Sequence, residues 1–417
     1  MKVFCCIDLK SFYASVECVE RGLDPFKANL VVADPERSRG TICLAVSPAM
    51  KKAGVKNRCR VFEIPKNIEY ITARPRMKLY MEKSAEIYSV YLKFISPEDI
   101  LVYSIDECFF DFSEYMHLYG KTPEELAKTI TDEVYKVTGI RAAAGLGTNM
   151  FLAKVALDIT AKHSPDFTGF LDEEKFKATI WHHRPITDIW NIGHGIAERL
   201  LKYGINDLYG VAHCREDILY KEFGVNAELL IDHANGLEPC TIADVHAYKS
   251  KTASVSNSQI LFSDYSFDEA YIILKEMVYG LVLEISEKNL VTDSISLSVG
   301  YAERNAKHTG GTRKLGESTQ SYGKIIGYFK NLYDETTPKT AKIRKITVGL
   351  NNLTDEIYKI YDFFSDPEKE KKETDLQKTV VDIKNKYGKN SLLKGTNYEP
   401  CATQRERNNM IGGHNGE

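Results

Sequence analysis

Two adjacent carboxylates, Asp106 and Glu107, lie within an apolar and aromatic stretch, residues 102–111. Neighbouring side chains of a regular strand point to opposite faces, so these two can share a site only where the chain bends, at a hairpin tip or a bulge. Two carboxylates held together repel each other unless a proton or a cation neutralises them. Because the flanking residues are apolar, we expect a divalent metal site that one further carboxylate completes.

Asp8 is the candidate for that carboxylate, because it ends a short apolar run, residues 3–7, typical of a buried strand. Mg²⁺ takes oxygen ligands and binds readily through one or two carboxylates together with substrate phosphates. Asp8, Asp106 and Glu107 would suit two such ions, with the Leu9 carbonyl as a further ligand. The alternative is that Asp8 caps the next helix and that the acidic pair is a solvated turn.

Three motifs in register favour the metal site. They are DLKSFYASVE at 8–17, SIDE at 104–107 and AGLGTN at 144–149, the last followed by LAK at 152–154. In order and spacing they resemble the signatures of Y-family translesion DNA polymerases, and the resemblance runs over nearly the whole chain. The closing residues 402–403 and 407–414 resemble the UmuC/ImpB/MucB-like bacterial branch of that family.

The resemblance implies a DNA-directed DNA polymerase, a nucleotidyltransferase of low fidelity that carries out translesion synthesis in DNA repair and the SOS response. Its substrates would be primer–template DNA and deoxynucleoside triphosphates, and Asp8, Leu9, Asp106 and Glu107 would hold two Mg²⁺ per active site. Two alternatives come from other classes. A non-catalytic DNA-binding accessory protein is disfavoured by the intact acidic trio, and a nucleotidyl cyclase is disfavoured by the expected DNA-binding regions.

The resemblance also places an aromatic side chain under the sugar of the incoming nucleotide. Tyr13 occupies the position of the family residue that excludes a 2′-hydroxyl, and Phe12 lies beside it. An aromatic ring can reject ribose by steric clash. The alternative for both residues is an ordinary place in the hydrophobic core.

Lysines are expected to bind the triphosphate. Lys51 stands where well-known members of the family carry an arginine, so the charge is kept without the bidentate fork, and Pro48 replaces their tyrosine. Lys162 matches a triphosphate-binding lysine, although one residue more than usual separates it from Asp158. Lys154 is a weaker candidate for a contact near the active site.

A chain of 417 residues is too long for one typical core. We expect a multidomain α+β fold, and the resemblance implies a right hand with a ferredoxin-like palm, small fingers and a helical thumb, followed by a β-α-β-β-α-β little finger. The expected ranges are palm 1–10 and 76–165, fingers 11–75, thumb 166–240, linker 241–252, little finger 253–352 and C-terminal tail 353–417.

Hydrophobic periodicity and capping residues predict the elements of these parts. In the first half of the chain, helices are expected at 11–18, 48–53, 77–91, 123–137 and 148–158, and strands at 3–7, 29–33, 41–45 and 140–146. In the little finger, strands are expected at 254–261, 293–301 and 343–350, and helices at 267–287 and 321–332. The tail should be polar from 365 to 375 and partly helical from 376 to 386.

Two regions are expected to bind DNA. Residues 188–200 resemble a helix-hairpin-helix, in which Gly193 and Gly195 allow a tight turn and the next helix directs its first amides at a phosphate; an ordinary helical turn is the alternative. The second half of the little finger carries a basic stripe suited to a DNA backbone. The stripe comprises Arg304, Lys307, Arg313, Lys314, Lys324, Lys330, Lys339, Lys342, Arg344 and Lys345, of which we expect Arg304, Arg313, Lys314, Lys342 and Arg344 to contact DNA.

Bulk composition sets wider limits. The net charge of −3 does not argue for nucleic-acid binding, but DNA contact depends on where the basic residues lie. Nine cysteines without a CxxC pair indicate reduced thiols, with neither disulfides nor a zinc site. No apolar run could cross a bilayer, and no signal-peptide pattern opens the chain. We therefore expect a cytoplasmic, nucleoid-associated protein with no membrane partner.

One segment of the tail suggests a protein partner. Residues Ile360, Tyr361, Asp362, Phe363 and Phe364 resemble the peptide by which bacterial polymerases bind the sliding clamp, although the usual leading glutamine is missing. An activating subunit would be a further partner. Residues 407–414 carry the branch signature without an assigned role, and we expect them to be either disordered or packed back on the palm.

Overall fold

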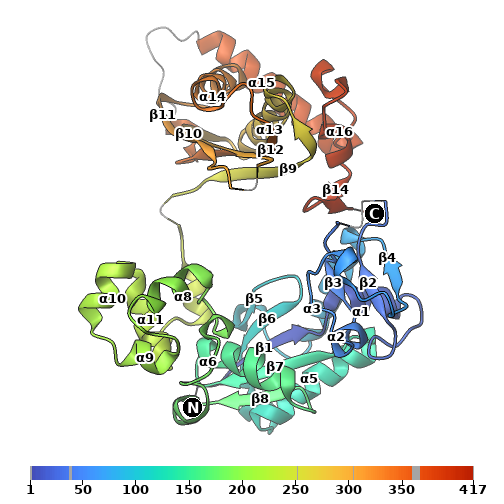
Figure 1. Ribbon diagram of the computed structural model, residues 1–417, viewed down its shortest axis with the longest axis vertical. Coiled ribbons are helices and arrows are strands. Elements are labelled where there is room, and N and C mark those ends of the chain that lie inside the picture. The colour runs from blue at the N-terminus through green and yellow to red at the C-terminus, as the bar shows by residue number, and fades with distance from the viewer. Residues whose placement is uncertain (1, 37–39, 251, 304, 359–366, 417) are drawn as a thin grey trace. The chain divides into compact units, whose positions relative to one another are not determined.

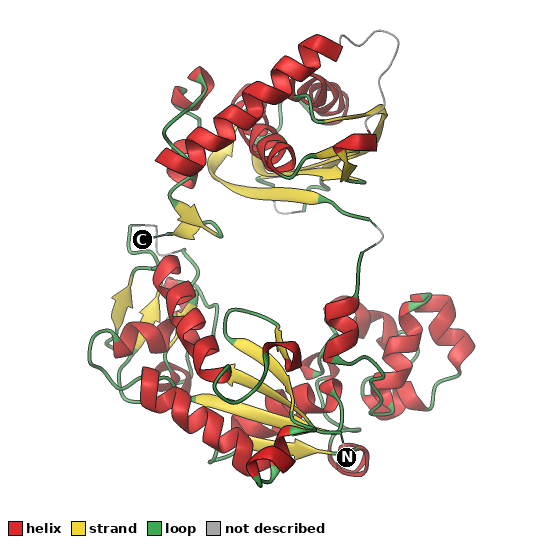
Figure 2. Ribbon diagram, turned by 180° about the vertical axis from the view of Figure 1, so that it is seen from behind, coloured by secondary structure: helices red, strands yellow, loops and turns green. Residues whose placement is uncertain are grey.

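The computed structural model describes residues 2–36, 40–250, 252–303, 305–358 and 367–416. The chain divides between Tyr248 and Lys249 into two compact units, each built on a five-stranded sheet (Figures 1 and 2). Both units combine helices with sheets, which confirms the α+β multidomain class. Within the described residues, no helix is long and apolar enough to cross a membrane.

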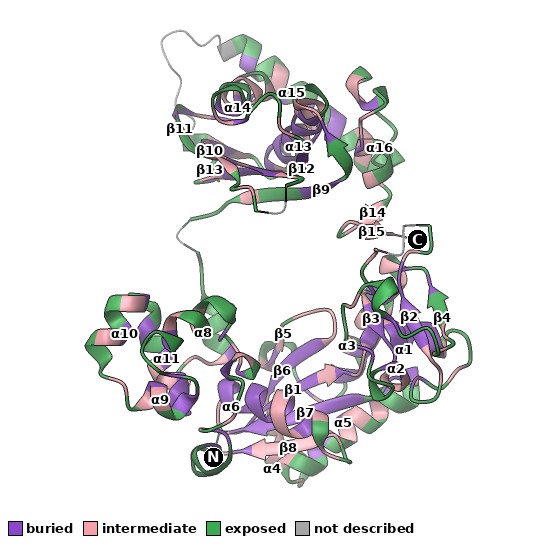
Figure 3. Ribbon diagram, in the orientation of Figure 1, coloured by how far each residue is buried: buried purple, intermediate pink, exposed green. Residues whose placement is uncertain are grey.

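The main sheet of the larger unit has the strand order β5-β6-β1-β7-β8. The strands are β1 Phe4–Leu9, β5 Ile100–Val102, β6 Glu107–Asp111, β7 Ala142–Gly147 and β8 Thr168–Leu171. Helices α3 Met77–Tyr91 and α5 Pro123–Thr138 cover one face, and α6 Met150–Val155 covers the other. In Figure 3 most of these strands are buried between the two layers. This arrangement has the layers expected of the palm, but β8 lies in the range 166–240 that we assigned to the thumb.

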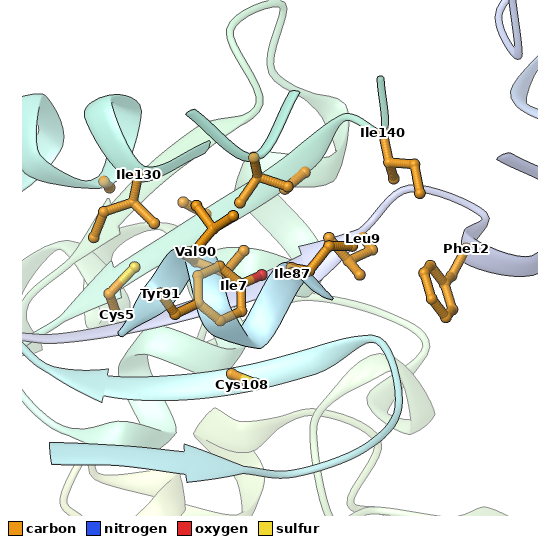
Figure 4. Close-up of a cluster of buried hydrophobic side chains, with 14 of the residues drawn as sticks. Cys5, Ile7, Leu9, Phe12, Ile87, Val90, Tyr91, Cys108, Ile130 and Ile140 are labelled. Atoms are coloured by element: carbon orange, nitrogen blue, oxygen red, sulfur yellow. The ribbon is translucent and has the colours of Figure 1, made fainter. Parts of the chain in front are cut away.

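The alternation of side chains along β1 separates the core from the functional face. Cys5, Ile7 and Leu9 point into a cluster with Ile87 and Tyr91 of α3 (Figure 4). The residues between them, including Asp8, point to the face that carries α6, because successive strand side chains alternate. We expected the strand to end at Asp8. Instead Asp8 lies inside the paired strand.

The region expected to form the fingers contains α1 Phe12–Val19, α2 Pro48–Lys52 and a small sheet of order β3-β2-β4, with β2 Leu30–Val32, β3 Ala45–Val46 and β4 Ile71–Ala73. The cap of α2 is confirmed, because the Ser47 side chain accepts from the Met50 amide at 3.3 Å. The strand expected at 41–45 is wrong except for its last residue. The Cys43 amide donates to the Cys59 carbonyl at 2.8 Å and the Val61 amide to the Thr41 carbonyl at 3.0 Å, so residues 41–43 pair with 59–61. Pairing with β2 begins only at Leu44, whose amide donates to the Val32 carbonyl at 2.8 Å.

Helices make up the region that we expected to be the thumb. They are α7 Glu173–Thr179, α8 His194–Leu201, α9 Leu208–Ala212, α10 Glu216–Phe223 and α11 Asn226–Ala234. These helices share a hydrophobic core to which α6 of the palm also contributes. The following helix, α12 Ile242–Ala247, occupies the first half of the segment expected to be a linker. Ile242 packs with Phe4 and Phe109 of the palm, and the His246 ring lies 3.1 Å from the Ile100 carbonyl. A short helix α4, Tyr115–Tyr119, connects β6 to α5.

The smaller unit has the predicted β-α-β-β-α-β order. Its sheet runs β11-β10-β12-β9, with β9 Val255–Tyr265, β10 Leu290–Tyr301, β11 Thr309–Thr319 and β12 Ile343–Asn351, and β13 Thr354–Asp355 pairs with the start of β10. Helices α13 Phe267–Glu287 and α14 Tyr322–Thr336 cover one face. Strand β11 had no predicted counterpart, because its sequence, TGGTRKLGEST, has few apolar residues and no alternation.

The tail is more ordered than its polar sequence predicts. Helix α15, Pro367–Tyr387, begins inside the segment expected to be only polar. Glu373 explains this, because its carboxylate accepts from the Ser321 hydroxyl at 2.6 Å and from the Gly323 amide at 3.0 Å. Residues 367–416 continue through α16 Gln404–Arg407 to a hairpin, β14 Met410–Ile411 and β15 His414–Asn415.

The closing part of the tail is held by one carboxylate on α13. Glu276 accepts from the side-chain amide of Asn397 at 2.7 Å and from the backbone amides of Thr403 and Gln404 at 3.0 and 3.1 Å. Of the two outcomes expected for residues 407–414, disorder is wrong, because this stretch contains the end of α16 and the β14–β15 hairpin. The clamp-like peptide 360–364 and Arg304 lie outside the described residues.

Candidate active site

The acidic residues come together where β1 meets the β5–β6 hairpin. Antiparallel pairing places Asp8 directly opposite Glu107. The Leu9 amide donates to the Asp106 carbonyl at 2.9 Å, and the amides of Tyr103 and Ser104 both donate to the Glu107 carbonyl at 3.0 Å. The chain therefore turns tightly just before Glu107, and the predicted hairpin tip is confirmed.

The negative charge of Asp106 affects the pKa of Asp8. The Ser104 hydroxyl holds Asp106 by donating to Oδ1 at 2.8 Å. Burial raises the pKa of Asp8 from 3.8 to about 6; Lys162 opposes this rise, and the charges of Asp106 and Glu107 add to it. The charges of Asp106 and Glu107 therefore act on the Asp8 carboxyl group.

Two lysines from the segment after β7 offset these charges. Lys154 Nζ lies 2.5 Å from Glu107 Oε1 and 3.1 Å from Asp158 Oδ2. Lys162 Nζ lies 2.8 Å from Asp158 Oδ1 and 3.4 Å from Asp8 Oδ2. Burial alone would lower the pKa of Lys162, but Asp8 and Asp158 outweigh it and raise that pKa. From sequence alone, Lys154 was a weaker candidate for this site than Lys162, because nothing in its local sequence identifies Glu107 as its partner.

The unusual spacing before Lys162 has a structural counterpart. Residues Ala156–Thr160 form a π-helical turn, which is wider than an α-helical one and accommodates an additional residue. Lys162 still reaches Asp8, at 3.4 Å. The additional residue therefore leaves the lysine beside the carboxylates.

Two glycines of β7 allow this segment to lie directly on the sheet. A Cβ atom added to Gly145 would lie 2.2 Å from both the Ala153 carbonyl oxygen and the Leu157 nitrogen. One added to Gly147 would lie 2.4 Å from the Ala153 nitrogen. Only glycine permits backbone approach this close. The AGLG motif thus sets the distance between the sheet and the helix that carries Lys154.

The donor set suits a divalent cation, because three carboxylates and a backbone carbonyl supply the oxygen ligands that Mg²⁺ prefers. In the part of the chain that the structure describes, however, no three His, Cys, Asp or Glu side chains converge closely enough to hold a metal ion. Glu107 and Asp8 bind Lys154 and Lys162 instead. A cation would compete with these two lysines for the carboxylates.

Two further lysines approach the site. Burial lowers the pKa of Lys51, while the charge of Asp8 opposes that shift, so Lys51 lies within electrostatic reach of the carboxylates. Burial also lowers the pKa of Lys10 to about 8, and the neighbouring Lys162 and Lys51 contribute. Sequence reasoning missed Lys10, although its position two residues after Asp8 was a signal that could have revealed it.

The two aromatic residues of α1 have different surroundings. Phe12 is 2 % exposed and lies in the hydrophobic core, which favours the core alternative for this residue (Figure 4). Tyr13 is half-buried and stacks on Tyr80, with ring centroids 4.5 Å apart and planes 18° apart. Burial raises the pKa of Tyr13, and the charge of Asp106 adds to the shift. Tyr13 therefore borders the acidic site.

The glycines of the expected helix-hairpin-helix do not make the turn themselves. Gly193 caps α8 with a φ of −84°, and the left-handed residue of this loop is Asn191, with a φ of 67°. The role assigned to the glycines as turn-formers is thus wrong. Apart from the adjoining residues and the helix's own backbone, no atom of the described residues lies within 4 Å of a Cβ added to Gly193 or Gly195, so this helix end presents open backbone.

The basic stripe of the smaller unit is divided between the two faces of the sheet. Register places Lys345 opposite Gly300 and Lys314 opposite Ser294, on the face away from α13 and α14. Small polar residues share this face, and they are Ser256, Ser258, Ser296, Ser298, Thr312 and Thr347.

Two of the arginines predicted to bind DNA, Arg313 and Arg344, are engaged in ion pairs. Arg313 bonds Glu335 at 2.7 Å, and Arg344 lies 3.3 Å from Asp264. Lys342 directly precedes β12, and its carbonyl accepts from the Ala302 amide at 2.9 Å. Acidic side chains from outside the stripe therefore offset part of its positive charge in the folded unit.

Comparison with known proteins agrees with this architecture. The sequence profile described as the impB/mucB/samB family matches residues 7–158, and that of its C-terminal domain matches residues 252–360. UvrX of Bacillus subtilis (strain 168), provisionally named for UV-damage repair, is 31% identical over 98% of this chain and 96% of its own length. DNA polymerase IV 2 of the same organism is 30% identical over 99% of this chain and 98% of its own length.

A solved structure shows the same fold. The Y-family DNA polymerase chimera Dbh-Dpo4(243-245)-Dbh superposes with a TM-score of 0.64 at 22% sequence identity, covering 85% of this chain and 99% of the chimera. The two profiles and the full-length relatives identify the family. This chain belongs to the impB/mucB/samB family of Y-family DNA polymerases.

Proposed function

We propose that this chain is a template-directed DNA polymerase of low fidelity, which extends a primer past damaged template bases by two-metal-ion nucleotidyl transfer. The observation that carries the proposal is the acidic trio Asp8, Asp106 and Glu107 at one sheet end, with lysines around it. Carboxylates supply metal ligands, and lysines neutralise phosphate oxygens. Family membership supports the same activity.

In the reaction, the primer 3′-oxygen attacks the α-phosphorus of the incoming nucleotide and pyrophosphate leaves. Two Mg²⁺, held by Asp8, the Leu9 carbonyl, Asp106 and Glu107, would activate the hydroxyl and neutralise the developing charge. Lys51 and Lys162 would bind the triphosphate, and Tyr13 would meet the sugar at the position of a 2′-hydroxyl.

DNA would be held mainly through its backbone. The helix-free face with Lys314 and Lys345 offers small side chains and charge, and the open backbone at Gly193 and Gly195 offers amides for a phosphate. Arg313 and Arg344 would contribute where phosphate displaces Glu335 and Asp264, and Lys342 would add its positive charge. Contacts of this type predict binding that weakens steeply with salt.

Protein partners extend the proposal. The peptide 360–364 would bind a sliding clamp through its aliphatic and aromatic side chains, and an activating subunit would regulate access to damaged DNA. Such an enzyme would work in the cytoplasm at the nucleoid, where its DNA substrate lies.

Primer extension with Mg²⁺ tests the proposal, on an undamaged template and on one with an abasic site. We expect slow addition on both templates, and its loss in Asp106→Asn, while the affinity for primer–template DNA, measured by fluorescence anisotropy, is kept. Asn can still accept from Ser104, so the hairpin should persist. Asp111→Asn, at the far end of the same strand, is the matched control and should remain active.

Retained turnover in Asp106→Asn would refute the metal assignment. No addition by the unmodified protein, even with the clamp and an activating subunit, would instead support a non-catalytic DNA-binding accessory protein.

A further inference from the structure

The ring on which Tyr13 stacks is itself tied to a buried ion cluster. Tyr80, on α3, is 0% exposed, and one face of its ring lies against Tyr13 with a centroid distance of 4.5 Å. Its hydroxyl donates to Glu17 Oε1 at 2.7 Å. Tyr80 therefore connects the ring of Tyr13 to the carboxylate of Glu17.

Glu17 is a carboxylate with no exposed side-chain surface and three partners. Arg76 binds it in a bidentate manner, with Nε 3.0 Å from Oε1 and Nη2 2.8 Å from Oε2, and Arg21 donates to Oε2 as well. Burial alone would raise the pKa of Glu17, but the hydrogen bonds from Arg76, Tyr80 and Arg21 lower it. The carboxylate is thus fixed in position by Arg76 and Tyr80 at the start of α3 and by Arg21 just beyond the end of α1.

The placement of these groups makes Tyr13 depend on them. Tyr13 and Glu17 are four residues apart on α1, so they lie on the same helical face. Helix α1 has only eight residues, and Ser11 at its start has a φ of 50° and makes no side-chain capping bond. A helix this short is marginal without tertiary contacts. Tyr80 and Arg76 supply such contacts on the face that carries Tyr13.

We propose that Glu17 and Tyr80 are positioning residues for sugar selection, which hold the Tyr13 ring where a 2′-hydroxyl would collide with it. The inference rests on the proposed function, in which Tyr13 faces the sugar of the incoming nucleotide. A loosened ring would move aside and admit ribonucleotides, while the metal ligands would remain in place.

The ratio of kcat/KM for a deoxynucleotide to that for the matching ribonucleotide tests this proposal. Tyr80→Leu removes both the ring stack and the hydroxyl, and we expect it to lower the ratio by roughly two- to twelve-fold, the range given by the strength of an aromatic pair. Tyr80→Phe keeps the ring and should give a smaller loss. Glu17→Gln retains the shape but weakens the cluster and should also lower the ratio.

A matched control separates positioning from general damage. Tyr91 is a second buried tyrosine of α3, packed edge-on against Phe110, in the core on the other side of the sheet from Asp8. Tyr91→Leu should lower stability and leave the ratio unchanged. If Tyr80→Leu folds poorly, the ratios measured for Tyr80→Phe and Glu17→Gln are compared with that of Tyr91→Leu instead.

A double variant decides whether Tyr80 acts through Tyr13. Tyr13→Ala should lower the ratio most, and adding Tyr80→Leu to it should have no further effect. If Tyr13→Ala lowers the ratio but Tyr80→Leu does not, or if their effects multiply, the positioning role is refuted and the sugar-facing role of Tyr13 stands. If Tyr13→Ala itself leaves the ratio unchanged while Asp106→Asn abolishes synthesis, both roles are refuted and the polymerase assignment stands.

Discussion

Replacement of Lys154 by methionine should expose how the acidic site is neutralised. Lys154 and Glu107 lie 2.5 Å apart, with side chains only 8% and 9% exposed. Burial would lower the pKa of Lys154, but the neighbouring Cys6, Glu107 and Asp158 raise it above its ordinary value, so the lysine is charged. Methionine keeps most of the apolar stem and removes the charge.

The expected cost follows from leaving Glu107 buried without its cation. Removing one partner of a buried ion pair costs about 3–5 kcal/mol. For a unit of this size, each kcal/mol lowers Tm by about 2–4 °C, which gives a decrease of roughly 6–20 °C. Saturating Mg²⁺ should narrow the difference from the unmodified protein, because a cation bound at Glu107 replaces the missing ammonium.

Thermal unfolding with EDTA and with Mg²⁺ measures both effects. The matched control is Lys128→Met on α5, whose ammonium lies 3.1 Å from Asp132 but is 71% exposed. An exposed pair contributes at most about 1 kcal/mol, so this variant should lose little stability and should respond to Mg²⁺ as the unmodified protein does. Equal losses in the two variants, or a Lys154→Met deficit that ignores Mg²⁺, would refute the reasoning.

Two more predictions concern the same site. Gly145→Ala should lower the free energy of unfolding by at least about 1–3 kcal/mol in denaturant unfolding, because the new methyl group overlaps the backbone of the facing helix. The control Gly195→Ala has open space around it and should be nearly neutral. Similar losses of unfolding free energy in the two variants would contradict this account. The pKa of Asp8 is raised from 3.8 to about 6, so the folded state holds its proton more tightly than the unfolded state. Metal-free protein should therefore lose on the order of 2–3 kcal/mol as pH rises from about 4 to about 6, measured by Tm against pH, and Asp8→Asn should remove this slope. A slope unchanged in Asp8→Asn would assign it to other groups.

The sequence by itself determined the elements whose signals are local. The range predicted for α13, 267–287, matches the helix to the residue, because Ser266 and Glu269 form a capping box before a long apolar stripe. The range 77–91 also matches α3 to the residue, although Arg76 at its N-cap makes no side-chain capping bond. The bend at Asp106 also followed from sequence, since two adjacent carboxylates cannot share one face of a strand.

The tertiary structure alone decided which side chains meet across the fold. Lys154 forms an ion pair with Glu107, Tyr80 stacks on Tyr13, and Glu276 accepts a hydrogen bond from the C-terminal tail. The partners in these contacts are separated by tens to more than a hundred residues of sequence. Periodicity reports only which face of an element is apolar, and it carries no information on the partner of a polar group buried on that face. Strand β11 escaped prediction for a related reason: pairing with β10, rather than its own composition, makes it a strand.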